Sequence, residues 1–176
     1  MTVPTESDTD VAGKPACAAT NPKGPTGRLA TWLADTTLDD IPSAVREHAK
    51  HLCSLMALPA PCGAQLPVSP KGVDSIIALD NTGSTLLIGW GGRTTSSTSV
   101  AMLNSSFIQA FELDDYHPLA PLYSNSLVIP AMLAAAPHVG RVSGGRFLLG
   151  AILGYETGPR VGQALGGLEM LSRGWH

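Results

Sequence analysis

The fold of this chain depends most on residues 100–118, whose sequence is VAMLNSSFIQAFELDDYHP. The first part is apolar at helical spacing, through Val100, Leu103, Phe107 and then Ala110 and Phe111. Apolar residues three and four positions apart lie on one side of a helix, so the pattern predicts an amphipathic helix over residues 98–111. That helix should pack its apolar side into a core.

The second part of the stretch is densely polar. Glu112, Asp114, Asp115, Tyr116 and His117 fall together in a chain that is only 14% charged. If they follow a helix directly, its dipole disfavours each carboxylate by roughly 0.3–1 kcal/mol. Two readings stay open: a solvated helix end, or an acid/base and ligand-orienting cluster at the mouth of a pocket.

Composition narrows the class of protein. The 176 residues fit one domain, the net charge is −3, and no basic run indicates binding to nucleic acid. Three cysteines without CxxC spacing indicate neither a disulfide framework nor a zinc site, which favours a reducing compartment. No apolar run reaches the roughly 18 residues of a membrane span. The polar, acidic start carries no recognisable export signal, so a cytoplasmic location is the default expectation.

The remaining pattern predicts an all-α fold with one short extended segment near residues 84–90. Residues 1–27 lack apolar periodicity and are rich in polar residues, proline and glycine, so we expect a disordered tail. Asp39 or Asp40 should cap the second helix, with Pro42 in its first turn. Further helices are predicted over residues 28–34, 41–52, 69–79, 126–139 and 144–165.

Two segments have unusual composition. Pro59 and Pro61 interrupt an otherwise helical apolar run over residues 53–63, because proline removes a donor and clashes with the preceding turn. In the last long helix, glycine recurs every four residues, which predicts close approach of another helix in a core or at a dimer interface. The glycines are Gly150, Gly154, Gly158, Gly162 and Gly166.

Several segments together resemble the MmgE/PrpD family, which includes 2-methylcitrate dehydratases and cis-aconitate decarboxylases; the similarity is greatest to the fungal decarboxylases. No single segment is diagnostic, but the set occurs in the family's order. The segments are residues 38–43 (LDDIPS), 104–110 (NSSFIQA), 112–117 (ELDDYH), 120–122 (APL), 128–131 (VIPA), 158–162 (GPRVG) and 174–176 (GWH).

The resemblance implies a fold and a chemistry. Residues 28–176 correspond to the N-terminal portion of the family's helical domain, and the smaller lid domain is expected to be absent from this chain. Family members hold a polycarboxylate and move protons, so that carbon dioxide or water leaves, and they need no cofactor and no metal. Relatives are often dimers, which raises the expectation of a homodimer. No nucleic acid or membrane partner is implied.

The resemblance also assigns roles to individual residues. His176 matches the histidine of an Arg-Gly-Trp/Phe-His type segment and is the candidate proton donor. Glu112 and Tyr116 are the other candidate catalytic residues, and Glu112 would orient a neighbouring base or a substrate hydroxyl. Asp115 and His117 would bind substrate.

Tyr123 completes the candidate substrate-binding residues and departs from the family pattern. Relatives usually carry histidine in this segment, whereas a tyrosine of ordinary pKa near 10 is a poor proton shuttle at neutral pH. The sequence therefore leaves three functions open. They are a cis-aconitate decarboxylase-like lyase of fungal secondary metabolism, a 2-methylcitrate dehydratase-like hydro-lyase, and a truncated non-catalytic remnant.

Overall fold

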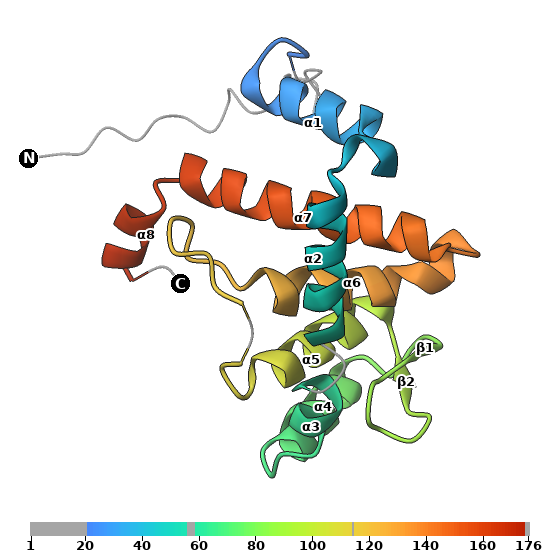
Figure 1. Cartoon of the computed structure of the whole chain (residues 1–176). Helices are drawn as coiled ribbons and strands as arrows, with labels where there is room; N and C mark the ends of the chain where they lie inside the picture. The colour runs from blue at the N-terminus through green and yellow to red at the C-terminus, as the bar shows by residue number, and fades with distance from the viewer. Residues whose placement is uncertain (1–20, 56–58, 114, 175–176) are drawn as a thin grey trace, which may run out of the picture. The chain divides into compact units, whose positions relative to one another are not determined.

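A computed structural model describes residues 21–55, 59–113 and 115–174 of the chain (Figure 1). The described part is mainly α-helical, as the sequence predicts, and it divides into two compact units with the boundary between Thr36 and Thr37. The second unit contains a 3-10 helix η2 (Leu38–Asp40), strands β1 (Thr85–Leu86) and β2 (Thr94–Thr95), and the helices α2 (Ser43–Leu55), α3 (Pro59–Ala64), α4 (Ser69–Leu79), α5 (Ser97–Gln109), α6 (Ser124–Val139), α7 (Gly144–Ala164) and α8 (Leu168–Ser172).

The first unit contains helix α1 (Pro25–Asp35). It starts three residues before the predicted helix, inside the stretch expected to be a tail, because Pro25 occupies the first turn where its missing N–H costs nothing. Thr36 ends the helix: its backbone N–H donates to the Trp32 carbonyl at 3.0 Å, and its hydroxyl does so at 2.6 Å. The last residues of the predicted tail are therefore helical, and its first 20 residues lie outside the described residues.

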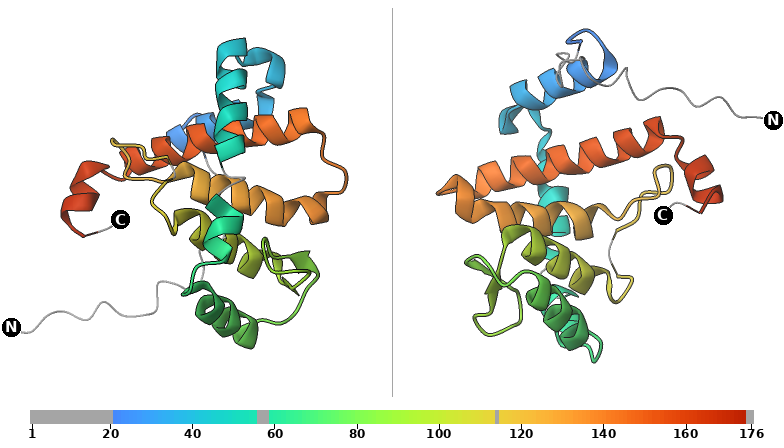
Figure 2. Two further views of the ribbon diagram at one scale, coloured as in Figure 1. Left: turned by 60° about the horizontal axis from the view of Figure 1, so that its bottom comes forward. Right: turned by 180° about the vertical axis from the view of Figure 1, so that it is seen from behind.

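Within the second unit, α6 packs between α5 and α7 (Figures 1 and 2). Helix α2 runs across α7 and also contacts α6, while α3 and α4 pack against α5. His138, near the end of α6, forms a hydrogen bond through Nε2 with the hydroxyl of Ser97 at the start of α5. The predicted active-site segment lies in the connection from α5 to α6, so these two helices position it.

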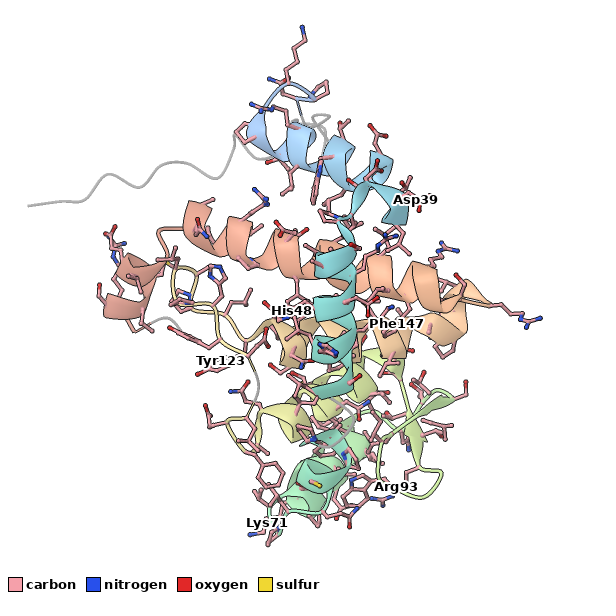
Figure 3. The ribbon with its side chains drawn as sticks, viewed as in Figure 1. Asp39, His48, Lys71, Arg93, Tyr123 and Phe147 are labelled. Carbon is pink, nitrogen blue, oxygen red and sulfur yellow. The ribbon has the colours of Figure 1, made fainter. Side chains whose placement is uncertain are left out.

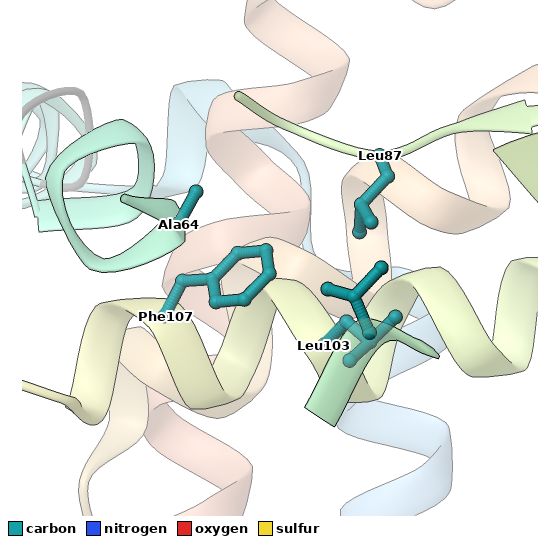
Figure 4. Packing of buried hydrophobic residues seen from close by; sticks show 5 residues of the cluster. Ala64, Leu87, Leu103 and Phe107 are labelled. Carbon is teal, nitrogen blue, oxygen red and sulfur yellow. The ribbon is translucent and has the colours of Figure 1, made fainter. Parts of the chain in front are cut away.

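The predicted apolar side of α5 is largely confirmed. Val100, Leu103 and Phe107 are at most 4% exposed, and the last two join the main apolar cluster (Figure 4). Phe111 is 37% exposed, because the helix ends at Gln109 rather than at residue 111. The other buried members of the cluster come from α3, α4 and the strand region, and they are Ala64, Val73 and Leu87.

The glycines of α7 let α6 and the loop before it come close. A β-carbon built on Gly154 would lie 2.6 Å from a methyl carbon of Val128, and one on Gly162 would lie 2.8 Å from the β-carbon of Ala120. Contacts this short do not occur between real side chains, so only glycine permits this spacing. The stripe therefore serves packing within the chain. Gly166 lies beyond the helix, at a positive φ of 103°.

The extended segment is shorter than predicted and is paired. Thr85 and Leu86 form an antiparallel ladder with Thr94 and Thr95, and a turn through residues 87–93 connects them. The second strand carries no apolar alternation, so the sequence did not indicate it.

The two prolines of the interrupted run fall in the first turn of α3. Helix α2 ends at Leu55, and α3 begins at Pro59. A proline in the first turn removes no intrahelical hydrogen bond, so the predicted clash is avoided by starting a new helix.

Among the described helices, none has the length and apolar character needed to cross a membrane.

Asp80 links the end of α4 to the start of α5. Its carboxylate accepts hydrogen bonds from the hydroxyls of Ser96, Ser99 at 2.6 Å and Thr82 at 2.9 Å. These donors, Ser96 foremost, lower the pKa of Asp80 from 3.8 to about 2. The ionised carboxylate is thus the form that the fold holds.

We expect Gly63→Ala to destabilise the chain strongly and Gly72→Ala to leave it intact or improve it. A β-carbon on Gly63 would lie 1.9 Å from the carbonyl oxygen of Phe107, whereas nothing lies within 4 Å of one on Gly72. Overpacking typically costs about 1–3 kcal/mol, and alanine gains up to about 1 kcal/mol over glycine within a helix. Urea denaturation followed by circular dichroism would measure both, and equal stability of the two variants would contradict the packing.

We expect acid to weaken the fold through Asp80. Because the folded-state pKa is below the ordinary value, the stabilisation is complete above 3.8 and is lost as the pH falls through about 2. Ser99→Ala removes one donor and should reduce this loss of unfolding free energy between pH 4 and pH 2. Ser106→Ala, whose hydroxyl bonds only locally to Met102, is the control. An unchanged acid dependence in Ser99→Ala would contradict the assignment.

Candidate functional site

The candidate residues of the acidic loop, residues 112–117, do not sit on the last turn of a helix. Helix α5 ends at Gln109, and Glu112 then adopts a left-handed conformation with φ of 53°. Its N–H donates to the Gln109 carbonyl at 3.0 Å, and its exposed carboxylate accepts a long bond of 3.5 Å from the Gln109 amide. The chain therefore turns away from the helix axis before the remaining acid of the described loop, Asp115.

Asp115 lies at the beginning of the next helix instead. Its Oδ1 accepts a hydrogen bond of 2.7 Å from the backbone N–H of Asn125, the second residue of α6. Tyr123, at the N-cap position, makes no capping bond with its side chain, so Asp115 supplies the cap from ten residues upstream. The helix dipole consequently favours this carboxylate, which corrects the expectation from sequence that it would be disfavoured.

Buried polar side chains hold the start of α6 in place. The hydroxyl of Ser126 bonds to the Gln109 side chain at 3.1 Å and to the Tyr123 carbonyl at 3.0 Å. The amide of Asn125 donates to the Leu52 carbonyl of α2 at 3.3 Å. Asn125 is 1% exposed, and its Oδ1 has no hydrogen-bond partner within the described ranges.

Sequence reasoning missed Asn125 and Gln109. The signal available was a polar triplet, residues 124–126 (SNS), at the head of an otherwise apolar helix. Buried polar groups carry a cost unless they are hydrogen-bonded, so such a triplet points to a structural or binding role.

Tyr116 and Tyr123 form an aromatic pair. Their ring centroids lie 5.2 Å apart at an interplanar angle of 50°, a tilted arrangement typical of favourable aromatic contacts. Tyr116 is 47% exposed, and Tyr123 lies on the segment that enters α6 (Figure 3). The pair joins the two ends of the loop, so a change in one ring should move the other.

His117 begins a tight hairpin. Its backbone N–H donates to the Leu122 carbonyl at 2.9 Å, and its carbonyl accepts from Ala120 at 3.2 Å. Its Nδ1 is buried and has no partner among the residues that the structure describes. The hairpin rests on α7, where Gly158 faces Leu122 and Gly162 faces Ala120.

The structure thus brings four predicted site residues into one connection: Asp115, Tyr116, His117 and Tyr123. Glu112 stands at its exposed start. His176, the candidate proton donor, lies outside the described residues.

Two other features lie away from this connection. A surface cleft of about 310 Å³ is lined by Ala64, Gln65, Pro70, Gly89 and Trp90, none of them a candidate site residue. The guanidinium of Arg93 lies 5.4 Å from the centre of the Trp90 ring.

Within the described ranges, no group of three or more histidine, cysteine or acidic side chains could hold a metal ion.

Comparison with known proteins gives a family match over most of the chain. The family model described as the MmgE/PrpD N-terminal domain matches residues 27–176. No solved structure matches the chain.

Two fungal relatives show the extent of similarity. A cis-aconitate decarboxylase of Aspergillus terreus is 42% identical over 157 residues, which cover 87% of this chain and 32% of the relative. A cis-aconitate decarboxylase-like protein, oryM, of Aspergillus oryzae is 40% identical over 163 residues, covering 86% and 32%. The chain therefore spans about a third of the length of these curated relatives.

We expect Asp115→Ala to destabilise α6. Loss of an N-terminal cap costs about 0.5–2 kcal/mol, and amide exchange at Asn125 should accelerate. Asp39→Ala is the matched control, because the Asp39 side chain is fully exposed and lies 3.9 Å from its partner Arg46. Denaturant titration and amide exchange measured by NMR would test both variants. An Asp115→Ala variant as stable as Asp39→Ala would refute the capping role.

Proposed function

Because this chain belongs to the MmgE/PrpD family, we propose that it provides the acidic loop of a carbon–carbon lyase acting on cis-aconitate or an alkylated di- or tricarboxylate. A setting in fungal secondary metabolism belongs to the same proposal. The observation that carries it is the similarity to the cis-aconitate decarboxylase of A. terreus, at 42% identity over 87% of the chain. That similarity includes the connection in which the candidate residues gather.

The proposed reaction breaks the bond between a carbon atom and one carboxylate. Carbon dioxide leaves without the bonding electron pair, which remains on the carbon framework and shifts with the double bond. One proton then bonds to carbon, so the product has one carboxylate fewer. A positioned general acid typically accelerates such a proton transfer about 10²–10⁴-fold, and His176 is our candidate for that acid.

The loop geometry supports a separate role for each of the other candidate residues. Asp115 is engaged by the N-terminus of α6, so it would position the loop that binds the substrate rather than meet a substrate carboxylate itself. The phenols of Tyr116 and Tyr123 and the imidazole of His117 can donate hydrogen bonds to carboxylates. Glu112, exposed on its left-handed turn, would orient a neighbouring base.

One observation favours the non-catalytic alternative. Tyr123 stands where relatives usually carry histidine, and its ring is packed against Tyr116. A phenol so placed can hold a carboxylate but transfers protons poorly at neutral pH. A chain with this residue could keep the binding surface of the family without its turnover.

We expect the chain, supplied with the part of the A. terreus relative that lies outside the matched stretch, to release carbon dioxide from cis-aconitate. His176→Gln should lower the rate about 100-fold or more, because a general acid is lost. His48→Gln, on the exposed side of α2, should leave the rate unchanged and is the control. Product analysis by NMR in D₂O would show deuterium bonded to carbon.

The same assay separates the alternatives. If the assay detects loss or addition of water without release of carbon dioxide, the activity is that of a hydro-lyase and not of a decarboxylase. No turnover of cis-aconitate or 2-methylcitrate would support the non-catalytic remnant. If Tyr123→His then restored turnover, the tyrosine at position 123 would be identified as the cause of the lost activity.

A further inference from the structure

We propose that the surface cleft between the end of α3, the start of α4 and the turn through residues 87–93 binds a small aromatic carboxylate, of which benzoate is the simplest. We call it the Trp90 cleft, and its lining residues are Ala64, Gln65, Pro70, Gly89 and Trp90. None of them is a candidate residue of the acidic loop, so this proposal does not rest on the proposed function.

The size and walls of the Trp90 cleft suit one planar ring. Its volume of about 310 Å³ lies at the low end of small-molecule sites, which run from about 300 to 1,000 Å³. The walls are mostly apolar, with the methyl group of Ala64, the ring of Pro70 and the indole of Trp90. Indole and aromatic ligands pack well in offset or tilted arrangements, so an aromatic group gains most from these walls.

The cleft is built from elements that hold one another in place. Gly89 adopts a positive φ of 76°, and a β-carbon on it would lie 2.7 Å from the β-carbon of Ala64, so the turn comes as close to α3 as glycine allows. The side-chain amide of Gln65 donates to the Gly89 carbonyl at 2.9 Å. Trp90 itself packs against the main apolar cluster. The cleft is therefore a consequence of the fold and not of one loose side chain.

Trp90 carries a hydrogen-bond donor that has no acceptor. Its Nε1 is buried and without a partner in the part of the chain that the structure describes. A buried donor left unpaired destabilises a fold, and such groups are rare unless a water or a ligand completes them. A carboxylate oxygen in the cleft would supply the acceptor once the indole turns slightly toward it. The missing group is thus an acceptor rather than a donor.

The charges beside the cleft favour an anion. The guanidinium of Arg93 lies over the Trp90 ring and pairs with Asp74 at 3.0 Å, so that cation is already neutralised. Lys71 follows Pro70 directly, is exposed, and has no ion-pair partner within the described residues. Figure 3 shows both cations at the end of the unit where α3 and α4 lie. One uncompensated positive charge therefore remains next to an apolar cleft, which is the complement of an aromatic acid.

The test is an NMR titration of the full 176-residue chain, labelled with nitrogen-15, against benzoate at constant ionic strength. The chain has three tryptophans, Trp32, Trp90 and Trp175, and their indole N–H signals are assigned from single Trp→Phe variants. We expect the Trp90 signal to move downfield and saturate, with a dissociation constant of about 1 mM for a ligand this small. The Trp32 signal should stay in place.

Two probes and two variants separate the contributions. Benzyl alcohol and benzylamine keep the ring but replace the carboxylate, and they should bind more weakly than benzoate. Lys71→Gln should weaken benzoate about 2–5-fold, as expected for one exposed charge. Lys50→Gln, whose ammonium pairs with Glu47 on α2, is the matched control and should change nothing. Trp90→Phe keeps an aromatic wall without the donor and should weaken benzoate about 2–10-fold.

Several results would overturn the proposal. One is an unmoved Trp90 signal at excess benzoate, or equal movement of the Trp32 and Trp90 signals. Equal binding of the acid, the alcohol and the amine would refute selection for a carboxylate. So would equal effects of Lys71→Gln and Lys50→Gln, a comparison of two exposed positions that does not depend on how well Trp90→Phe folds.

Discussion

The close contact between α6 and α7 determines where everything else in the second unit can lie. Glycine at position 154 removes a β-carbon that would meet Val128 of α6, and glycines at positions 158 and 162 leave room for Leu122 and Ala120 of the hairpin before it. Each glycine within a helix costs up to about 1 kcal/mol relative to alanine, so packing must offset that cost. Helix α6, held against α7 on one side, presents its other side to α5 and its first turn to the acidic loop.

The same contact supports the candidate site. Two glycines of the stripe lie under the hairpin that carries His117, and the first turn of α6 receives the carboxylate of Asp115. The buried amide of Asn125 then reaches α2, and the hydroxyl of Ser126 bonds to Gln109 of α5, so three helices and one loop meet in one polar cluster. The geometry of this connection therefore depends on helix packing as much as on its own side chains.

Much of the fold could be predicted from sequence, because its signals are local. Helix α4 has the predicted bounds, and α7 begins at the predicted residue, where the hydroxyl of Ser143 accepts from the N–H of Arg146 at 3.2 Å. The acidic loop was different. Periodicity carried the helix to Phe111, but the chain turns at Glu112, and the partner of Asp115 lies ten residues away. Neither the turn nor this hydrogen bond can be predicted from the local spacing of apolar residues.

The hairpin on α7 also bears on how this family can change its length. Surface loops usually accept insertions and deletions, because nothing fixes both of their ends. Here Asp115 and Asn125 bond to each other across the loop, and its tip lies against glycine. One residue more or fewer would disturb either the cap or the contact, so this loop should tolerate substitutions better than changes of length.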